Sequence, residues 1–294
     1  MRITDNMVSQ QTILSLQQNL ERLQALQTQI STGQKINQPS DDPTGTAQLL
    51  GYNTVQSQVD QYQRNLTYVQ TSLQVADTAI GAGQDVLNAV KQIALGLTSG
   101  ATSDQLATAS SQVQSQIDQL VDVANTTDSN GHYIFSGTQT QTAAYAADGT
   151  YQGDDGVTST DVGAGVSIAR NLPGSQVFGG SGTGVDVFGV LKDLKTAIDN
   201  NDPAGIQTAL TQIDQANDQV TQAQAEVSVR LQAAQSNQTS LTNFANTVSQ
   251  LKSNLDSVDV TQAIVEFQSQ QTALQAAEQA SAIILQTSLL DFLK

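Results

Sequence analysis

An apolar repeat between Tyr52 and Leu97 constrains the fold of this chain more than any other feature. Its positions alternate in steps of three and four residues, and all but Gly83 are apolar. A spacing that averages 3.5 residues keeps one seam of an α-helix facing partner helices, so the segment predicts a coiled-coil-like core helix. An unbroken helix of this length would measure about 65–70 Å. We expect an interruption at Gly81 and Gly83, because glycine weakens a helix interior by roughly 1 kcal/mol. The seam consists of Tyr52, Val55, Val59, Tyr62, Leu66, Val69, Leu73, Ala76, Ile80, Gly83, Leu87, Val90, Ala94 and Leu97.

A second long seam runs from Ile206 to Leu255 with the same spacing. Eleven of its fifteen positions are apolar, and the exceptions are Asn217, Gln224, Gln238 and Lys252. Asp202-Pro203 precedes it, as Asp42-Pro43 precedes the first long helix, and both pairs suit an N-cap followed by the first helical residue. We expect the two long helices to pack antiparallel.

Two shorter helices are predicted beside the long ones. The first is expected to be capped by Ser103 or Asp104 and has its seam at Leu106, Ser110, Val113, Ile117, Leu120 and Ala124. The second begins at about Val187 and has Phe188, Leu191, Leu194 and Ile198 on one face.

The segment between these two helices has a different composition. More than half of the glycines and half of the aromatic residues of the chain lie between Ser129 and Gly189. Short runs of strand-forming residues separated by glycines indicate a small β domain. We expect strands at residues 133–135, 166–169 and 176–178.

Both ends of the chain predict amphipathic helices. The first carries apolar residues from Ile13 to Ile30 and ends at Gly33, a C-cap position. The last follows Asp259, which has capping-box spacing to Gln262. After Ala276 its apolar surface widens to several faces, and such a helix is not expected to remain exposed to water.

These elements predict a mainly α fold with an inserted small β domain, in which both chain ends build a long antiparallel helical rod or coiled-coil-like bundle. We expect a terminal helix pair from residues 1–40 and 258–294 that serves assembly. A helical rod domain is expected from residues 41–128 and 187–257, and an exposed glycine-rich β insertion from residues 129–186.

The charge distribution limits the classes of partner. The chain has 294 residues and a formal charge of −16, with 11 basic residues in total, so binding to nucleic acid or to an anionic membrane surface is not expected. Both ends are nearly neutral. Residues 1–35 carry three basic and two acidic residues, and residues 260–294 carry one basic and three acidic. Nearly neutral ends suit surfaces that become buried. There is no apparent secretory signal peptide and no apolar run long enough to span a bilayer.

The motifs that could carry chemistry have simpler interpretations. The chain has no cysteine, and its one histidine, His132, lies in an expected turn without partners for a metal or a catalytic triad. Asp154-Asp155-Gly156 lacks the alternating ligands of a calcium loop and is expected to form a turn. Residues 179–184 are expected to be a flexible linker, and Asp41 and Asp42 to be caps. We therefore expect no catalytic residue, cofactor or metal.

Four short motifs resemble a known family. Ile30–Asn37, with Ser40-Asp41-Asp42, resembles the amino-terminal signature of bacterial flagellins and their hook-filament junction relatives. Residues 288–293 resemble the carboxy-terminal signature. Tyr133–Gly137 and Tyr151-Gln152-Gly153 resemble the middle segment of the junction relatives, and so does the proline after the paired aspartates, where flagellins usually have alanine.

The resemblance implies a subunit that is exported through the flagellar type III channel and forms a homo-oligomeric ring between hook and filament. Its implied partners are another junction protein, flagellin and an export chaperone, with neither nucleic acid nor membrane. It further implies that the terminal helices pair in the inner tube layer. The residues expected to contact neighbouring subunits are Ile13, Leu16, Leu20, Leu23, Ile30, Ile264, Phe267, Leu274, Ile284, Leu289 and Phe292.

Three other functions remain open at this stage. The chain could be flagellin itself, which would polymerise alone into long tubes. It could be a secreted hydrolase or glycan-binding protein with its activity in residues 129–189, although no catalytic set is apparent there. It could also be a type III tip or translocator protein, which would act on host cells rather than on motility.

Overall fold

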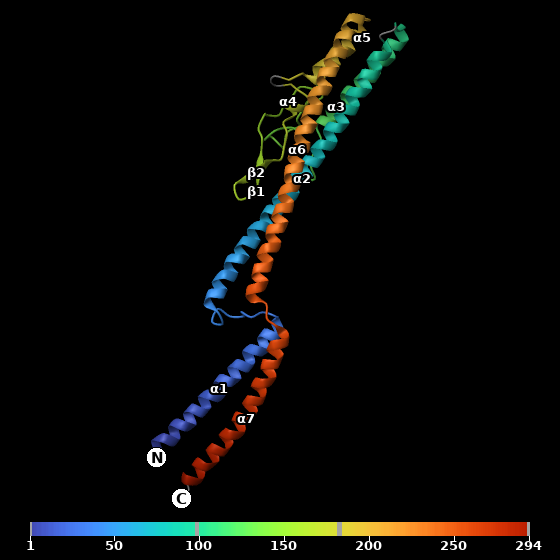
Figure 1. The fold of residues 1–294 in the computed structure, drawn as a ribbon. Helices are drawn as coiled ribbons and strands as arrows, with labels where there is room; N and C mark the ends of the chain where they lie inside the picture. Colours follow the sequence, from blue (N-terminus) through green and yellow to red (C-terminus); the bar gives the residue numbers. More distant parts are fainter. Residues whose placement is uncertain (1, 98–99, 181–183, 293–294) are drawn as a thin grey trace. The chain divides into compact units, whose positions relative to one another are not determined.

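The protein is mainly α-helical with one small β insertion, as the sequence predicts (Figure 1). The computed structural model describes residues 2–97, 100–180 and 184–292. The long helices are α1 (Arg2–Thr32), α2 (Pro43–Leu97), α6 (Pro203–Asp256) and α7 (Val260–Phe292). The shorter elements are α3 (Ser103–Ala124), β1 (Ser159–Gly163), β2 (Val166–Ala169), α4 (Gly174–Val177) and α5 (Val187–Asp199). Among the described residues, no helix has the length and apolar character that crossing a membrane requires.

The chain divides into two compact units. Residues 1–58 and 244–294 form one, which we call the terminal unit, and residues 59–243 form the other, the central unit. The terminal unit combines both ends of the chain.

Within the central unit, α2 and α6 lie side by side and antiparallel (Figure 1). Lys91 on α2 forms an ion pair with Asp214 on α6. Gln84 Nε2 donates to Thr221 Oγ1 at 3.2 Å. Gln84 lies seven residues before Lys91 on α2, and Thr221 lies seven residues after Asp214 on α6. The opposite direction of these steps confirms the expected antiparallel packing.

The seam predicted for α2 is the buried seam of the central unit. From Val59 to Ala94 its apolar positions other than Tyr62 are buried. The interruption expected at Gly81 and Gly83 is wrong, because α2 is one continuous helix. Packing explains why a glycine stands at position 83. A Cβ atom there would lie 2.8 Å from Cε1 of Phe178, so the missing side chain gives that ring its space.

The seam predicted for α6 needs correction at several positions, among them Lys252, which is exposed. Asn217 and Gln224 were placed on it, but the buried residues are their neighbours Ala216 and Ala223. Small alanines allow close approach of the partner helix, and a fixed spacing rule does not distinguish them from the polar residues beside them. From Val227 onward the buried positions recur every seven residues, at Val227, Ala234, Leu241 and Val248.

The insertion contains less β structure than expected. The strand at residues 166–169 is confirmed as β2, which pairs antiparallel with β1, for example through Thr160 and Ile168. Residues 133–135 form only an isolated bridge from Tyr133 to Thr127, and residues 176–178 belong mainly to the short helix α4. Asn65 Nδ2 donates to the carbonyl of Asp161 at 2.6 Å, so the hairpin is attached to α2.

Aromatic residues, rather than a sheet, form the core of the insertion. The rings of Phe135 and Phe178 meet edge to face with centroids 5.5 Å apart, and those of Tyr145 and Phe188 lie 4.8 Å apart. The Tyr145 hydroxyl donates to the carbonyl of Gly179 at 2.7 Å, and burial raises the pKa of this phenol. A satisfied hydroxyl makes a fully buried tyrosine favourable here.

Caps fix the helix starts. Asp42 Oδ1 accepts from the N–H of Gly45, and Asp202 Oδ1 accepts from the N–H of Ala204, which confirms both aspartates as N-caps. The start of α3 is capped by Thr102, one residue before the predicted Ser103, through a full capping box with Gln105. Asp259 Oδ1 accepts from the N–H of Gln262, although the Gln262 side chain donates to Glu266 instead of closing the expected box.

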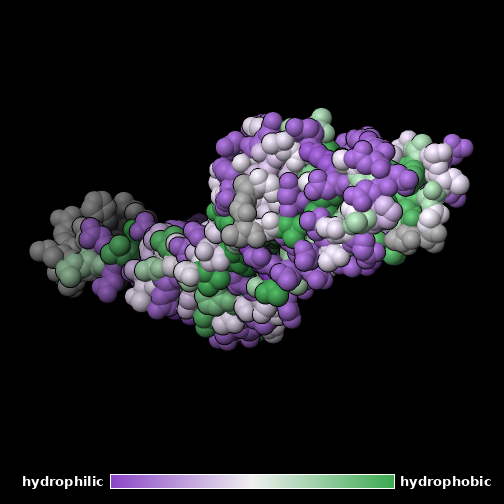
Figure 2. All heavy atoms as spheres, turned by 90° about the horizontal axis from the view of Figure 1, so that it is seen from above, coloured by the Kyte–Doolittle hydropathy of each residue, from purple (hydrophilic) through white to green (hydrophobic). Residues whose placement is uncertain are grey.

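The face shown in Figure 2 is largely hydrophilic, with separate hydrophobic patches. This distribution agrees with a water-exposed exterior.

Two glycines of α2 provide a matched test of the aromatic core. Gly83→Ala is expected to lower the free energy of unfolding by about 1–2 kcal/mol, because the overpacking against Phe178 exceeds the gain in helix propensity. Gly81→Ala is the control, since its Cβ would approach only Gln224 Nε2, at 4.0 Å, and it is expected to stabilise the protein by up to about 1 kcal/mol. Urea unfolding followed by circular dichroism measures both. Equal effects of the two substitutions would contradict the packing role of Gly83.

Candidate assembly interface

The described side chains of the terminal unit bury very little apolar surface. Its helices α1 and α7 lie side by side (Figure 1). Among the described side chains of this unit, the buried hydrophobic residues are Ile36, Val248 and Ala263. A helix pair gains most of its stability from its buried face, and the described side chains of α1 and α7 contribute little to such a face.

The same unit concentrates the exposed apolar side chains of the protein. Of the fourteen large hydrophobic residues that are exposed among the described side chains, ten lie in the terminal unit. Each exposes between 41% and 62% of its surface. They are Met7, Ile13, Leu14, Leu20, Leu50, Phe244, Leu251, Val260, Ile264 and Val265. Exposed apolar residues gathered on one part of a molecule indicate a surface for protein association.

The two chain ends are joined where α1 and α6 finish. Gln34 and Ser257 form an antiparallel bridge, and the Lys35 N–H donates to the carbonyl of Asp256 at 2.6 Å. The Ile36 N–H donates to Asp256 Oδ1 at 2.9 Å, and Asp256 is only 6% exposed. The buried carboxylate therefore satisfies a backbone donor 220 residues away in the sequence.

The linker between α1 and α2 is a folded turn. Gly33 ends α1 with φ +70°, as its predicted C-cap role requires. Asp41 Oδ2 accepts from the N–H groups of Asn37 and Gln38, at 3.0 and 2.9 Å, so it caps this turn rather than a helix. Gly45 is tightly enclosed, because a Cβ atom there would lie 2.5 Å from Asp42 Oδ2 and from Ile36 Cδ1.

One polar contact fixes the pairing of the terminal helices. Gln270 Nε2 on α7 donates to Asn19 Oδ1 on α1 at 3.0 Å, and both side chains are partly buried. A polar pair inside an apolar seam favours one register, because any shift leaves both amides without a partner.

The residues predicted to contact other subunits fall into three groups. Ile13, Leu20 and Ile264 are exposed. Partly buried members are Leu16, Leu23, Ile30, Phe267 and Leu274. Ile284, Leu289 and Phe292 belong to α7, but their side chains lie outside the described part. The apolar surface was predicted to widen after Ala276, and the part of that surface beyond Ala282 also lies outside the described side chains.

Several exposed apolar residues were missing from that prediction. Leu14 and Val265 lie beside the seam positions Ile13 and Ile264, and a single-seam pattern excludes such neighbours. Leu50, Phe244 and Leu251 lie on the long helices, whose apolar residues were expected in an intramolecular core. Their position off the buried seam of a long helix was the sequence signal that could have identified them as exposed.

The motifs considered for chemistry have structural roles. Asp154 accepts from the hydroxyl and N–H of Thr138 and from the N–H of Gly156, which lowers its pKa and closes a turn. The Asp128 carboxylate lies 3.5 Å from His132 Nδ1. The described residues contain no cluster of three or more potential metal ligands. Of the expected linker at residues 179–184, residues 181–183 lie outside the described part.

Comparison with known proteins supports the resemblance that the terminal motifs indicate. Residues 3–140 match the family model of the bacterial flagellin N-terminal helical region. Flagellar hook-associated protein 3 of Escherichia coli (strain K12) is 27% identical over an alignment that covers 95% of this chain and 96% of that protein. Flagellin of Listeria innocua is 28% identical, but that alignment covers only 49% of this chain and 50% of that protein.

A solved structure has the same fold. A putative flagellar hook-associated protein from Vibrio parahaemolyticus superimposes with a TM-score of 0.69 and 24% identity, over 74% of this chain and all of that chain. The resemblance to hook-associated protein 3 is thus confirmed over nearly the full length of the sequence.

The buried carboxylate that joins the chain ends can be tested directly. Asp256→Ala is expected to destabilise the contact between residues 34–36 and 256–257 by about 1–3 kcal/mol, because the Ile36 N–H loses its acceptor in a buried position. Hydrogen exchange at the amides of Lys35 and Ile36 should accelerate accordingly. Asn254→Ala is the control, since Asn254 is exposed on the same helix. Unchanged exchange in Asp256→Ala would contradict the proposed role of the carboxylate.

Proposed function

We propose that this chain is a structural subunit of the bacterial flagellum that acts at the junction between hook and filament. The observation that carries the proposal is its similarity to hook-associated protein 3 along 95% of the chain. The exposed apolar residues of the terminal unit agree with it, since they provide a surface that other subunits can cover. The location that follows is the flagellum, outside the cell, reached through the flagellar export system.

The alternative of a filament subunit is less well supported. The matching flagellin of Listeria innocua aligns with about half of this chain, whereas hook-associated protein 3 aligns with almost all of it, including the insertion. Purified protein that polymerises alone into long tubes would favour flagellin. A requirement for flanking proteins would favour the junction.

The finer assembly that we propose is a ring of identical subunits. One side of the ring contacts another junction protein on the hook, the other side contacts the first flagellin subunits, and a chaperone binds the chain before export. In this arrangement the exposed residues Ile13, Leu20 and Ile264 become buried between neighbouring subunits. The partly buried seam residues between α1 and α7 then hold the helix pair together.

We further propose that the terminal helices become stably ordered only during assembly. Ordering the backbone costs about 1–2 kcal/mol per residue, and the three buried hydrophobic side chains described in this unit cannot offset that cost for two long helices. Burying one Leu or Ile against a neighbour contributes roughly 1.5–3 kcal/mol. Several such residues per helix therefore make the ordered state favourable once neighbours are present.

Gene deletion with complementation tests the function. A deletion strain is expected to form hooks without filaments and to release flagellin into the medium. Wild-type protein should restore filaments, whereas Ile13→Asp should reduce them at least about tenfold, because an interface that must bury a carboxylate loses well over 1.4 kcal/mol. Electron microscopy and flagellin assays of the medium measure both effects.

The matched control in that experiment is Val229→Asp. Val229 is 66% exposed on α6 in the central unit, outside the proposed interface. This variant should restore filaments as the wild type does. Normal filaments in the deletion strain would refute the junction function, and equal failure of both variants would refute the location of the interface.

Hydrogen exchange on the purified monomer tests ordering on assembly. Amides in residues 10–30 and 265–290 are expected to exchange much faster than those in residues 66–94, where the α2 seam is buried. Slow exchange at both chain ends in the monomer would rule out the ordering mechanism and would leave the junction function standing.

A further inference from the structure

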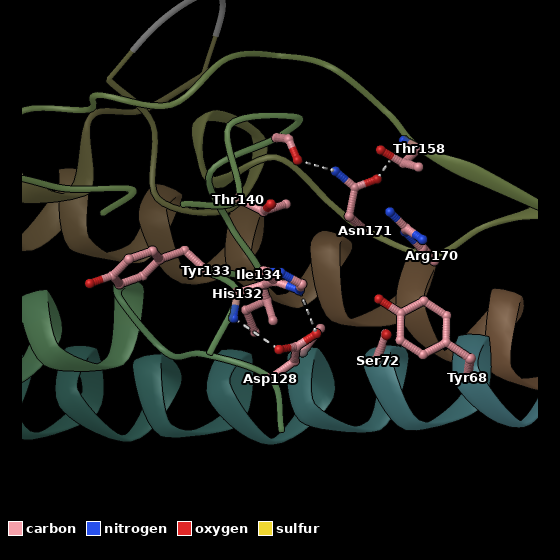
Figure 3. Close-up of a pocket in the computed structure, with 12 residues that line it drawn as sticks. Tyr68, Ser72, Asp128, His132, Tyr133, Ile134, Thr140, Thr158, Arg170 and Asn171 are labelled. Carbon is pink, nitrogen blue, oxygen red and sulfur yellow. Dashed lines mark hydrogen bonds and ion pairs between the residues drawn. The ribbon is translucent and has the colours of Figure 1, made fainter. Parts of the chain in front are cut away.

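The central unit contains a polar cavity that the proposed assembly does not use. It lies between α2 and the irregular segments of the insertion, with a volume of about 260 Å³ (Figure 3). Tyr68 and Ser72 come from α2, Asp128 and His132 from the loop after α3, and Arg170 from the end of β2. Chemically different groups from three parts of the chain thus surround one space.

Arg170 provides a positive charge at this cavity. Its guanidinium carbon lies over the Tyr68 ring, 5.3 Å from the ring centre, so the cation is attracted to an aromatic face. Lys91, Lys195 and Arg230 form ion pairs with carboxylates, but within the described residues Arg170 forms none. A guanidinium held in this way still has its N–H edge available, and that edge matches the geometry of a carboxylate.

Hydroxyl groups for which the described residues provide no acceptor also line the cavity. On α2, the hydroxyls of Thr67, Thr71 and Thr78 donate to carbonyls one turn earlier in the helix. The Ser72 hydroxyl makes no such bond among the described residues and lies on the cavity side of α2 (Figure 3). The hydroxyls of Thr140 and Thr158 likewise line the cavity without a described side-chain hydrogen bond. Hydroxyls in this state can donate to or accept from a ligand.

Asp128 supplies the acceptor at the other side. Burial would raise the pKa of Asp128, but the N–H groups of His132 and Asn130 outweigh this effect and lower it. Both N–H groups donate to Oδ1, at 2.9 and 2.8 Å, and Oδ2 lies 3.5 Å from His132 Nδ1. The carboxylate is therefore ionised at neutral pH and fixed in orientation.

The cavity walls are held rigidly. Asn171 accepts from the N–H of Thr158 at 2.7 Å and donates to the carbonyls of Gly137 and Gly156 at 3.2 and 3.0 Å. Arg230 of α6 donates to the carbonyl of Asn171 at 2.7 Å. A site that is formed before its ligand arrives loses less entropy on binding.

We propose that this cavity binds a small polyhydroxylated carboxylate, such as a sugar acid, with its carboxylate on Arg170 and its hydroxyls on Asp128 and Ser72. One guanidinium matches one negative charge, while the nearby Asp128 carboxylate disfavours phosphate and other dianions. The volume is slightly below the usual range of small-molecule sites, which restricts the ligand to one compact molecule.

Titration of the full-length protein with glucuronate, galacturonate and gluconate tests the proposal, with glucose, galactose and sorbitol as uncharged counterparts. Saturable binding is expected by calorimetry or ligand-observed NMR for at least one acid, and at least about tenfold weaker binding for its uncharged counterpart. Saturable binding by none of the acids would overturn the proposal, and so would equal binding of acid and counterpart.

Variants then locate the binding. Arg170→Gln is expected to weaken binding of the acid at least about tenfold, because the charge-assisted contact to the carboxylate is lost. Arg64→Gln is the control on α2, since Arg64 is exposed and donates to Gln61, and it should bind as the wild type does. Ser72→Ala serves as a second cavity variant with less risk to folding and should also weaken binding. Unchanged binding in both cavity variants, with folding verified by circular dichroism, would overturn the assignment.

Discussion

The antiparallel packing of α2 against α6 is the interaction on which the rest of the central unit depends. The seam from Val59 to Ala94 is buried at every position except Tyr62, and the insertion packs on the surface that these helices provide. Phe178 occupies the space left by Gly83, and Asn65 holds the β hairpin. The irregular backbone between Thr126 and Gly180 can therefore have little regular structure, because long helices supply its packing surface and several of its hydrogen-bond partners.

Much of this fold could be predicted from the sequence because its long helices are periodic. The α2 seam, the aspartate N-caps and the mainly α fold with a small insertion follow from spacing and from local cap chemistry. Gly83 was misinterpreted because its role depends on Phe178, which is distant in the sequence. Residues 176–178 were misassigned as a strand for a similar reason. Short apolar runs do not distinguish a strand from a buried helical turn.

The terminal surface was predictable in kind but not in extent. A seam pattern identifies Ile13 and Ile264, yet it says nothing of apolar residues that lie off a seam and therefore misses Leu50, Phe244 and Leu251. Their exposure becomes apparent only when the packing partners are known. The polar cavity was not predictable, because Arg170, Asp128 and Ser72 are distant in the sequence and belong to no motif.

The contact between Ile36 and Asp256 has a consequence for the order in which parts of the chain can fold during synthesis. Its two partners are separated by 220 positions, so this closure cannot form until nearly all of the polypeptide has emerged from the ribosome. Until Asp256 has been synthesised, the linker after α1 lacks this contact. The closure therefore follows the synthesis of the whole central unit, whose residues 59–243 all precede Asp256.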